Sequence, residues 1–393
     1  MMLDTALCLL LLAQTPDKPE SWGKGARLQS VGTTGINAYR SYVKGSLTIR
    51  KTPDGPLLKE AADYLVSPEF AMVGLGSSPS ISADDTVCAS YQFSLLRIDT
   101  VVVDGRGMAK LVRGKPDIAI PLAPEVLPGT TRLLNVFRDY GARTVTNDDL
   151  FPILDAPVDC VTHTTSGRIP KTLDKLRAGM PVTIVCWGDS VTCGGDVSRG
   201  SQKYVEQFRT MLLDRFSYAA PINIINISVG GTNSSMWLRR EPYNDAFFAQ
   251  NPMWPKDQTD FERIVSLKPD LVTIEFVNDG GLDTAGVETV YSDIMGRLAA
   301  FKTEFILITP HFTSLDMMGN KSLRDADGRK YVEGLRAFAD KHNVALADAS
   351  SRWAHLWREG VPYVTLLANC LNHPDDRGHR LFAEELIRCF DTP

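Results

Sequence analysis

The second half of the chain alternates short apolar runs with helical patterns, and this alternation limits the fold more than any other feature. Residues 182–187 are a continuous apolar run, as expected for a strand buried on both faces. Residues 204–212 then carry apolar side chains at helical spacing. A parallel sheet with helices on both faces is the architecture that such a pattern predicts. The same order repeats to the end of the chain, with strands expected at 222–227, 271–276, 305–308 and 344–347 and helices at 287–301, 331–338 and 380–390.

The region before this alternation, residues 35–154, has a β pattern. Residues 87–95 alternate apolar and polar side chains with the period of a strand. Two further apolar runs flank Asp104-Gly105, which predicts a hairpin. We therefore expect a smaller β-rich, sandwich-like domain over residues 35–154. A connector with one short helix, residues 155–180, would join it to an α/β domain of residues 181–393. Other strands are expected at 42–50 and 132–138.

The first 34 residues are predicted to be a separate segment. Residues 6–13 are apolar, which fits either an amphipathic or buried helix or the core of a signal peptide. The residues before them include Asp4 but no Lys or Arg, and no clear cleavage site follows, so the helix is favoured. No stretch reaches the roughly 20 apolar residues of a membrane span.

Composition narrows the partners and the compartment. The net charge is −5, with no basic patch, so nucleic acid is not an expected partner. The seven cysteines include no CxxC pair and no Cys/His cluster, which argues against a structural zinc site and against a disulfide framework. This mildly favours a reducing compartment, and a cytoplasmic location is slightly preferred over secretion. Nothing in the sequence predicts an oligomeric state.

Polar residues follow the expected strands at the points where the strands end. Gly188-Asp189-Ser190 follows residues 182–187, and Gly230-Gly231 follows residues 222–227. Asn278-Asp279 follows residues 271–276, and His373 lies in a polar stretch near the C-terminus. Because ligands bind at the carboxyl ends of parallel strands, these four groups are expected to converge on one crevice.

The residue types in these groups are those that acyl transfer requires. A serine hydroxyl is a poor nucleophile until a base removes its proton, and histidine is the side chain best suited to do so near neutral pH. A glycine allows a main-chain N–H to approach an oxyanion closely, and an asparagine side chain adds a second donor. The pattern therefore indicates a serine esterase.

The same residues carry a family resemblance. In their order along the chain they resemble the four conserved blocks of the GDSL/SGNH hydrolase superfamily, over residues 181–393. The resemblance implies a three-layer α/β/α domain and ester hydrolysis without a cofactor or metal ion. It implies that Ser190 is the nucleophile and His373 its base. The oxyanion hole would be the N–H groups of Ser190 and Gly231 and the side chain of Asn278, with Asp189 bracing the turn.

Two positions depart from the family pattern. Phe276 stands where the third block usually has glycine, which would narrow the pocket while leaving Asn278 in place. Cys370 stands three residues before His373, where the family usually has an aspartate that orients the imidazole. Three arrangements are open: a main-chain carbonyl near Asn369 or Cys370 orients the imidazole, a carboxylate from elsewhere does so, or the enzyme is weak or inactive.

Several other residues have a structural interpretation beside a functional one. His379 is interpreted as structural or capping, and His311 either lines the cleft or is structural. Trp187 and Trp237 either line an acyl pocket or belong to the core. Cys193 is expected to be a small buried thiol.

The predicted function is hydrolysis of short-chain acyl esters through an acyl-enzyme. Relatives with an added β-rich domain resemble carbohydrate O-acetyl esterases, so an O-acetylated carbohydrate is the first choice of substrate. The alternatives are a broad small-molecule carboxylesterase or lipase, and a catalytically weak SGNH binding protein.

Overall fold

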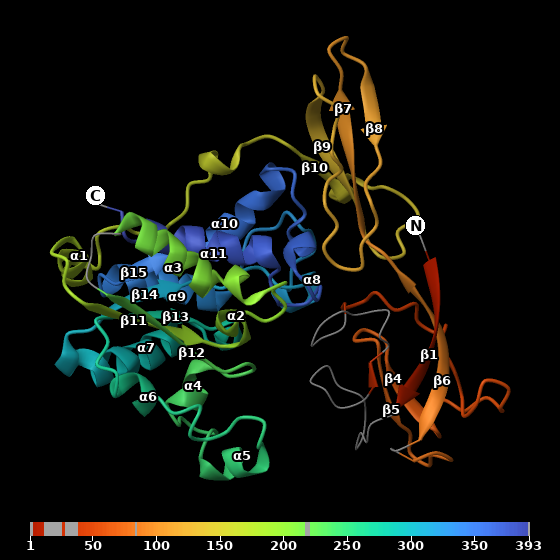
Figure 1. Ribbon diagram of the computed structural model, residues 1–393, viewed down its shortest axis with the longest axis horizontal. Helices are drawn as coiled ribbons and strands as arrows, with labels where there is room; N and C mark the ends of the chain where they lie inside the picture. The colour runs from red at the N-terminus through yellow and green to blue at the C-terminus, as the bar shows by residue number, and fades with distance from the viewer. Residues whose placement is uncertain (1–2, 12–25, 28–37, 83–84, 217–220, 392–393) are drawn as a thin grey trace.

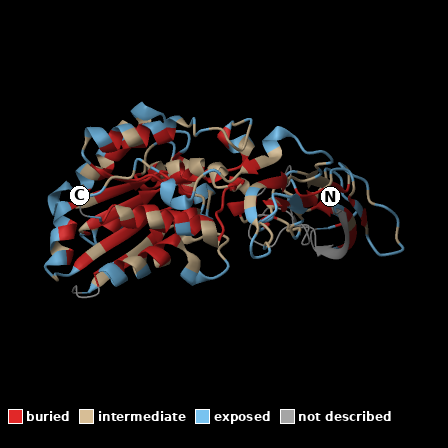
Figure 2. Cartoon of the chain, turned by 90° about the horizontal axis from the view of Figure 1, so that it is seen from above, coloured by how far each residue is buried: buried red, intermediate tan, exposed pale blue. Residues whose placement is uncertain are grey.

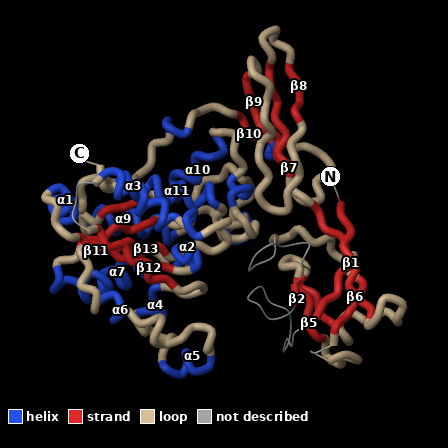
Figure 3. The backbone as a smooth tube through the Cα atoms, viewed as in Figure 1, coloured by secondary structure: helices blue, strands red, loops and turns tan. Residues whose placement is uncertain are grey.

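The computed structural model describes residues 3–11, 26–27, 38–82, 85–216 and 221–391. Two regions lie side by side, an N-terminal β-rich region and a C-terminal α/β region (Figure 1). A segment that runs from β10 to α1 crosses between them. Figure 3 shows that the helices gather in the α/β region, while the β-rich region is almost all strands and loops.

A five-stranded parallel sheet forms the centre of the α/β region. Its order is β12-β11-β13-β14-β15, so the chain starts in the interior, moves to one edge and then returns past its starting strand. The carboxyl ends of β11 and β13 therefore flank the point where the winding direction switches, which is where open parallel sheets bind ligands. The strands are β11 (Val182–Gly188), β12 (Ile222–Ser228), β13 (Leu271–Glu275), β14 (Glu304–Ile308) and β15 (Ala345–Ala347).

Helices cover both faces of this sheet, which confirms the predicted three-layer arrangement. Val182 and Ile184 point into a core shared with α1, α3 and α11, whereas Val185 and Trp187 point into a second core shared with α7 and α9. Figure 2 shows buried strands between partly exposed helices. The helices are α1 (Pro170–Arg177), α2 (Ser190–Cys193), α3 (Tyr204–Arg215), α4 (Ser234–Trp237), α5 (Asp245–Gln250), α6 (Glu262–Val265), α7 (Thr284–Leu298), α8 (Leu315–Met318), α9 (Lys330–Lys341), α10 (Ala349–His355) and α11 (Asp376–Arg388).

The described residues of the β-rich region form three small antiparallel sheets, in the orders β1-β6-β3, β2-β5-β4 and β10-β9-β7-β8. Ile49 and Tyr91 from the first sheet pack with Tyr64 and Val73 from the second, which gives the sandwich-like core that the sequence predicts. The strands are β1 (Leu3–Leu11), β2 (Ala26–Arg27), β3 (Thr48–Arg50), β4 (Tyr64–Ser67), β5 (Met72–Leu75), β6 (Thr86–Ser94), β7 (Arg97–Val103), β8 (Ala109–Val112), β9 (Thr131–Arg138) and β10 (Leu150–Pro152).

The N-terminal segment differs from the predicted helix. Residues 3–11 form β1, which pairs antiparallel with β6 from Leu3 opposite Ser94 to Leu11 opposite Thr86. A short apolar run fits a buried helix and a buried strand equally well by periodicity. Pairing with β6 selects the strand over the helix. Because β6 is far away in the sequence, a local pattern does not predict this pairing. Most of residues 12–37 lie outside the described ranges.

The two regions share a small core of their own. Ile98, Phe137 and Phe151 from the β-rich region pack with Cys370 from the α/β region. The side-chain amide of Asn135 also donates a hydrogen bond of 2.7 Å to the Gly360 carbonyl. Within the described residues, no helix is long and apolar enough to span a bilayer.

Candidate active site

The serine predicted as nucleophile stands on a tight turn at the end of β11. Asp189 caps the short helix α2, and its Oδ1 accepts the Val191 N–H at 3.0 Å. Its Oδ2 accepts the Asn278 N–H at 3.0 Å, which ties the turn to the loop after β13. Ser190 is the first residue of α2 and is partly exposed. Asp189 thus braces the turn, as the sequence predicts.

A chain of two hydrogen bonds connects this serine to a histidine and an aspartate. The Nε2 atom of His373 lies 3.0 Å from the Ser190 hydroxyl oxygen, and its Nδ1 lies 2.8 Å from Oδ2 of Asp196. A carboxylate oxygen accepts hydrogen bonds, so this pairing favours the tautomer with the proton on Nδ1, in which the lone pair of Nε2 faces the serine. The aspartate and histidine side chains are 7% and 11% exposed, so water screens the pair little. The Nδ1 partner is thus a carboxylate from elsewhere in the chain, the second of the three open arrangements.

A glycine-rich turn after α2 brings this carboxylate to the imidazole. Gly194 and Asp196 have positive φ angles of 81° and 63°. A Cβ atom on Gly195 would lie 2.9 Å from both Cε1 and Nδ1 of His373, closer than such atoms pack. Only glycine lets the chain pass beside the ring at this point. The sequence signal was therefore Gly-Gly-Asp shortly after Ser190, which a search for D-x-x-H does not find.

The residue in the family's usual acid position has a different environment. The Cys370 sulfur lies 3.2 Å from the Tyr140 hydroxyl oxygen, so the side chain contacts the β-rich region. Burial raises the pKa of this thiol to about 12, which keeps it neutral. The Asn369 carbonyl accepts the Tyr39 N–H at 2.9 Å. The main-chain arrangement proposed for this loop is therefore wrong, because Asp196 is the Nδ1 partner.

The loop that carries His373 does not directly follow a strand, which corrects the sequence prediction. It lies between the 3-10 helix Tyr363–Leu366 and α11. The side-chain oxygen of Asn369 accepts the main-chain N–H groups of residues 371–373 at 2.9–3.0 Å. The side chain of one buried asparagine, and not the end of a strand, thus fixes the conformation of this turn.

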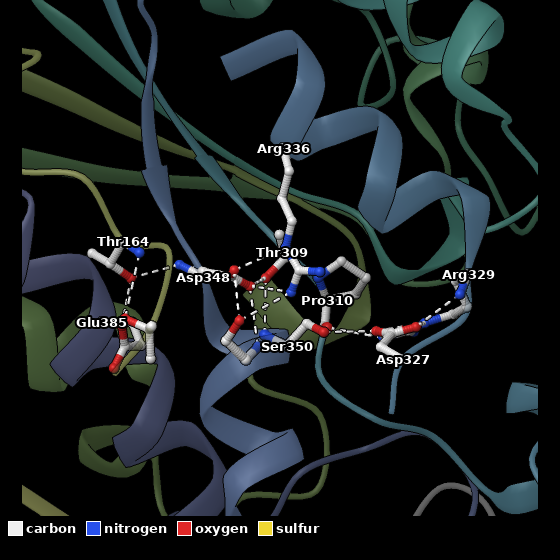
Figure 4. A network of polar contacts seen from close by, with 11 residues as sticks. Thr164, Thr309, Pro310, Asp327, Arg329, Arg336, Asp348, Ser350 and Glu385 are labelled. Carbon is white, nitrogen blue, oxygen red and sulfur yellow. Dashed lines mark hydrogen bonds and ion pairs between the residues drawn. The ribbon is translucent and has the colours of Figure 1, made fainter. Parts of the chain in front are cut away.

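A buried polar network around Asp327, Arg329 and Asp348 (Figure 4) includes a hydrogen bond to the main chain of His311, and His311 contacts the loop of His373. His311 is fully buried, and its Nε2 donates to the Asn372 carbonyl at 2.9 Å. Burial and the nearby Arg329 guanidinium hold the pKa of His311 well below its usual value. Arg329 pairs with Asp327 and donates to the carbonyls of Pro310 and His311 at 3.1 and 3.0 Å. His311 is therefore a structural residue and does not line the cleft.

The two predicted oxyanion donors lie on loops beside the serine. A Cβ atom on Gly230 would lie 3.6 Å from the Ser190 Cβ, so the loop after β12 passes directly against the nucleophile. Gly231 has a φ of 75°, a conformation that favours glycine. The Asn278 amide donates one hydrogen to the Thr232 carbonyl at 3.1 Å, and its second hydrogen remains available to an oxyanion.

Three carboxyl groups lie buried beneath these loops. Burial raises the pKa of Asp189 and of Glu275, and it raises the pKa of Asp279 to about 6. Asp279 accepts the Ser234 N–H at 2.9 Å, and Glu275 accepts the Thr192 hydroxyl at 3.0 Å. These acids thus link the loops after β11, β12 and β13 through neutral donors.

The aromatic residues considered for the acyl pocket belong to the core instead. Trp187 and Trp237 are almost fully buried, and their ring centroids lie 5.8 Å apart. Phe276 packs edge-on against Trp187 at 4.9 Å, so it points into the core and does not narrow the pocket as predicted.

Two further predictions concern residues near α2 and α11. His379 is structural, as predicted, because its Nδ1 accepts the Tyr204 N–H at 3.3 Å and burial lowers its pKa to about 4. Cys193 is partly exposed, not fully buried as expected.

Two residues of this site are not predicted from the sequence. One is Asp196. The other is Trp254, whose indole N–H donates to the Gly230 carbonyl at 3.0 Å. The only sequence signal for Trp254 was an aromatic residue in the long segment between two predicted strands, and its contact with the glycine loop depends on the fold.

Comparison with known proteins identifies the α/β region. The family model of the GDSL-like lipase/acylhydrolase family matches residues 186–381, which span the serine, both oxyanion positions and the histidine. Residues 186–381 belong to that family. It is a family of carboxylic ester hydrolases, in agreement with the sequence resemblance. A comparison with curated proteins gave no match.

Several solved structures are similar to this chain at low sequence identity. A two-domain esterase (CEX) active on acetylated mannans is 21% identical, with a TM-score of 0.43 over 58% of this chain and 54% of that chain. This chain thus spans about half the length of that esterase. LAE5, an α/β hydrolase from the metagenome of Lake Arreo, Spain, is 19% identical, with a TM-score of 0.38 over 54% of this chain and 97% of that chain. Protein YXIM_BACsu from Bacillus subtilis is 13% identical, with a TM-score of 0.37 over 98% of this chain and 97% of that chain.

Proposed function

We propose that this chain is a serine esterase that hydrolyses short acyl esters through a Ser190-His373-Asp196 triad. The observation that carries the proposal is the continuous hydrogen-bond chain of 3.0 Å and 2.8 Å through the two nitrogens of one imidazole. It gives a nucleophile, a base and an orienting acid in the order that acyl transfer needs. The interpretation as a weak binding protein rested on a missing acid, and this carboxylate removes its support.

In the proposed reaction the Ser190 oxygen attacks the ester carbonyl carbon while Nε2 of His373 takes the hydroxyl proton. Asp196 stabilises the imidazolium that forms and stays ionised. The carbonyl oxygen, now an oxyanion, accepts hydrogen bonds from the Ser190 and Gly231 N–H groups and from the Asn278 amide. The intermediate collapses, the alcohol leaves with the proton from His373, and an acyl-enzyme remains.

Water then repeats the sequence on the acyl-enzyme. His373 takes a proton from the water as its oxygen attacks the acyl carbon. The second intermediate expels the Ser190 oxygen, which regains its proton, and the carboxylic acid is released. The protein residues supply each proton transfer in this scheme, so it requires no cofactor.

We further propose that the natural substrate is an O-acetylated carbohydrate and that residues 35–154 form an accessory domain. The support is the family analogy with esterases that carry an added β-rich domain, which is a fold-level argument. Acetylated mannan, on which the two-domain esterase acts, is a suitable first polymer to test. Acetylated xylan and pectin complete the set.

The test begins with p-nitrophenyl acetate, butyrate and octanoate, assayed with the wild type and with Ser190→Ala. We expect the wild type to prefer acetate and Ser190→Ala to lose activity by about 10⁴-fold or more. Ser201→Ala is the matched control, because this serine is exposed, and it should behave as the wild type. Wild-type rates equal to those of Ser190→Ala contradict the esterase proposal.

The same experiment separates the substrate classes. Rates that rise with acyl chain length contradict the acetyl preference and favour a lipase-like enzyme. Acetate release from acetylated mannan, xylan or pectin, measured by an enzymatic acetate assay, supports the carbohydrate proposal. Hydrolysis of p-nitrophenyl acetate without release from any polymer or its oligosaccharides indicates a small-molecule carboxylesterase.

A further inference from the structure

An aromatic segment projects from the α/β region beside residues 229–233, the loop after β12 that we call the oxyanion loop. Residues 238–261 connect α4 to α6 and include α5, which extends away from the sheet edge (Figure 1). The family resemblance assigned no role to this segment. It carries Tyr243, Phe247 and Trp254 in one aromatic cluster.

Trp254 of this cluster is fixed against the loop that flanks the nucleophile. Its Nε1–H donates to the Gly230 carbonyl at 3.0 Å. A Cβ atom on Gly231 would lie 3.1 Å from Nε1 and 3.3 Å from Cζ2 of the indole. Gly230 in turn packs against Ser190, so one residue separates the indole from the nucleophile. The absence of a side chain at Gly231 lets the indole come this close.

The cluster is built to hold the indole in one orientation. The Phe247 ring stacks on Trp254 with a centroid distance of 5.8 Å and an interplanar angle of 10°. Tyr243 packs edge-on against Phe247 at 4.9 Å, and its hydroxyl accepts a hydrogen bond from the Asn233 amide at 2.9 Å. Asn233 belongs to the oxyanion loop, so both ends of the cluster are attached to that loop.

The cluster remains partly exposed, unlike the aromatic residues of the core. Trp254 and Phe247 are both of intermediate exposure, whereas Trp187 is fully buried. Among the residues that the structure describes, no second ring and no cation stacks on the other face of the Trp254 indole. An ordered aromatic surface beside a nucleophile is a feature of ligand sites.

We infer that Trp254, backed by Phe247, is a carbohydrate subsite on the alcohol side of the active site. This inference rests on the proposed esterase function and names the group that its cleft receives. In an O-acetyl sugar one oxygen joins the acetyl carbonyl carbon to a ring carbon, so the sugar ring must lie close to Ser190, and the indole is one residue away from that serine. A pyranose presents C–H bonds on its flat faces, and these complement the electron-rich face of an indole.

The surroundings favour a sugar over a long acyl chain. An acyl chain is best held in an enclosed apolar pocket, whereas the segment around Trp254 presents exposed polar side chains that include Gln250, Lys256 and Asp257. Such groups suit sugar hydroxyls. The indole N–H is already bonded to Gly230, so the ring offers its apolar face and not a donor.

The test compares a sugar ester with a substrate that is too small to reach the subsite. Ethyl acetate is that substrate, since the aromatic leaving group of p-nitrophenyl acetate could itself stack on Trp254. The sugar esters are O-acetylated manno-, xylo- and galacturono-oligosaccharides. For Trp254→Ala, we expect the ratio of kcat/KM on the sugar ester to kcat/KM on ethyl acetate to fall by about tenfold or more.

Further variants separate stacking from loop positioning. Trp254→Phe keeps a flat ring but loses the hydrogen bond to Gly230, and it should recover most of the lost ratio. Phe247→Ala keeps that hydrogen bond but removes the backing ring, and it should give an intermediate ratio. The control is Phe301→Ala, because Phe301 is 36% exposed beside the start of β14, away from the loops that carry the site. It should leave the ratio unchanged.

The outcomes distinguish this inference from the proposed function. An unchanged ratio in Trp254→Ala, with sugar esters hydrolysed by the wild type, overturns the subsite but keeps the esterase. An equal loss on both substrates assigns Trp254 to the oxyanion loop alone and also overturns it. A variant that changes only the preference for acyl chain length overturns the subsite as well. If Ser190→Ala binds none of the acetylated oligosaccharides by calorimetry and the wild type hydrolyses none, both the subsite and the carbohydrate substrate are wrong. Serine-dependent ethyl acetate hydrolysis would still support the esterase.

Discussion

Asp99 in the β-rich region and the acids beneath the nucleophile loop in the α/β region are both buried, but their pKa values are shifted in opposite directions. In the β-rich region, Asp99 is buried but forms two hydrogen bonds with Arg97, at 2.8 and 2.9 Å. Burial opposes its ionisation, yet these bonds prevail and the pKa of Asp99 is lowered. In the α/β region, Asp279 and Glu275 are bonded to neutral N–H and O–H donors, and burial raises the pKa of each. Perturbed acids of the second kind gather at functional sites, and here they lie beneath the nucleophile loop.

The two regions also make chemically different contacts with the loop that carries His373. The α/β region reaches the imidazole itself through the carboxylate of Asp196. The β-rich region reaches the other side of the loop through Tyr39, which donates to a main-chain carbonyl, and through Tyr140, which packs on Cys370. The difference indicates that the proposed reaction depends on the α/β region for charge and on the β-rich region for position. Substitutions on the two sides should therefore differ widely in size of effect.

The largest effect should come from the acid. We expect Asp196→Asn to lower kcat on p-nitrophenyl acetate by about 10³- to 10⁴-fold, because the amide no longer favours the productive imidazole tautomer. The control is Asp257→Asn, which changes an exposed aspartate by the same atoms. Retention of more than about a tenth of wild-type kcat would show that another group orients His373, since a missing acid costs far more than that.

Asp196 also shows which part of the site could not be predicted from the sequence. Ser190, Gly231 and Asn278 come two or three residues after β11, β12 and β13 end, so the pattern of strands was enough to place them on one edge of a sheet. Asp196 is brought to the imidazole by a turn with two left-handed residues, and local patterns do not encode the target of such a turn. Trp254 was missed for a similar reason, because its place beside the oxyanion loop comes from a long connection between strands.

Other predictions failed where tertiary contacts outweigh local preference. Phe276 occupies the family's glycine position, but the alternation along β13 directs its ring into the core. Residues 3–11 are apolar enough for a helix, but they pair with β6. In contrast, the parallel sheet was predictable, because strands buried on both faces leave continuous apolar runs in the sequence.

The second largest effect should come from the oxyanion donor on the α/β side. We expect Asn278→Ala to lower kcat by about 10²- to 10³-fold with little change in KM, because the amide would bond the oxyanion only in the transition state. The amide also donates to the Thr232 carbonyl, so a purely structural role has to be tested. Circular dichroism and the melting temperature are the control measurements. A loss of activity that follows a loss of folded protein would contradict the catalytic role.

A smaller effect concerns the pH dependence of stability, to which Asp279 and Asp99 should contribute with opposite sign. The folded-state pKa of Asp279 is about 6 against an ordinary value of 3.8, so the folded protein binds more protons in this interval. The stabilisation that Asp279 gives the folded state is fully present below pH 3.8, and it is lost as the pH rises towards 6. For Asp99 the lowered pKa means that stability is lost as the pH falls. We expect Asp279→Asn to reduce the loss of unfolding free energy between about pH 4 and pH 6, measured by denaturant titration.

The matched control for that measurement is again Asp257→Asn, which should keep the wild-type pH profile. A steeper loss of stability with rising pH in Asp279→Asn would contradict the sign derived from burial. If Asp279→Asn lowers the free energy of unfolding by the same amount at every pH, the variant has lost packing or hydrogen bonds without a change in proton binding. A pH-independent loss does not alter the slope of the unfolding free energy against pH.

The smallest effect should come from the residue in the family's usual acid position. We expect Cys370→Ala to keep kcat within about threefold of the wild type and to cost about 1 kcal/mol of stability, because the thiol packs in the small core that the two regions share. Cys370→Asp sharpens the comparison, since it restores the family's residue. The new carboxylate would lie among apolar side chains near Tyr140, so we expect lower stability. We expect no gain in kcat, because Asp196 already bonds to Nδ1 of the imidazole. A rise in kcat, or rescue of Asp196→Asn by Cys370→Asp, would show that the two positions are interchangeable and that an acid on the side of the loop that faces the β-rich region can also orient His373.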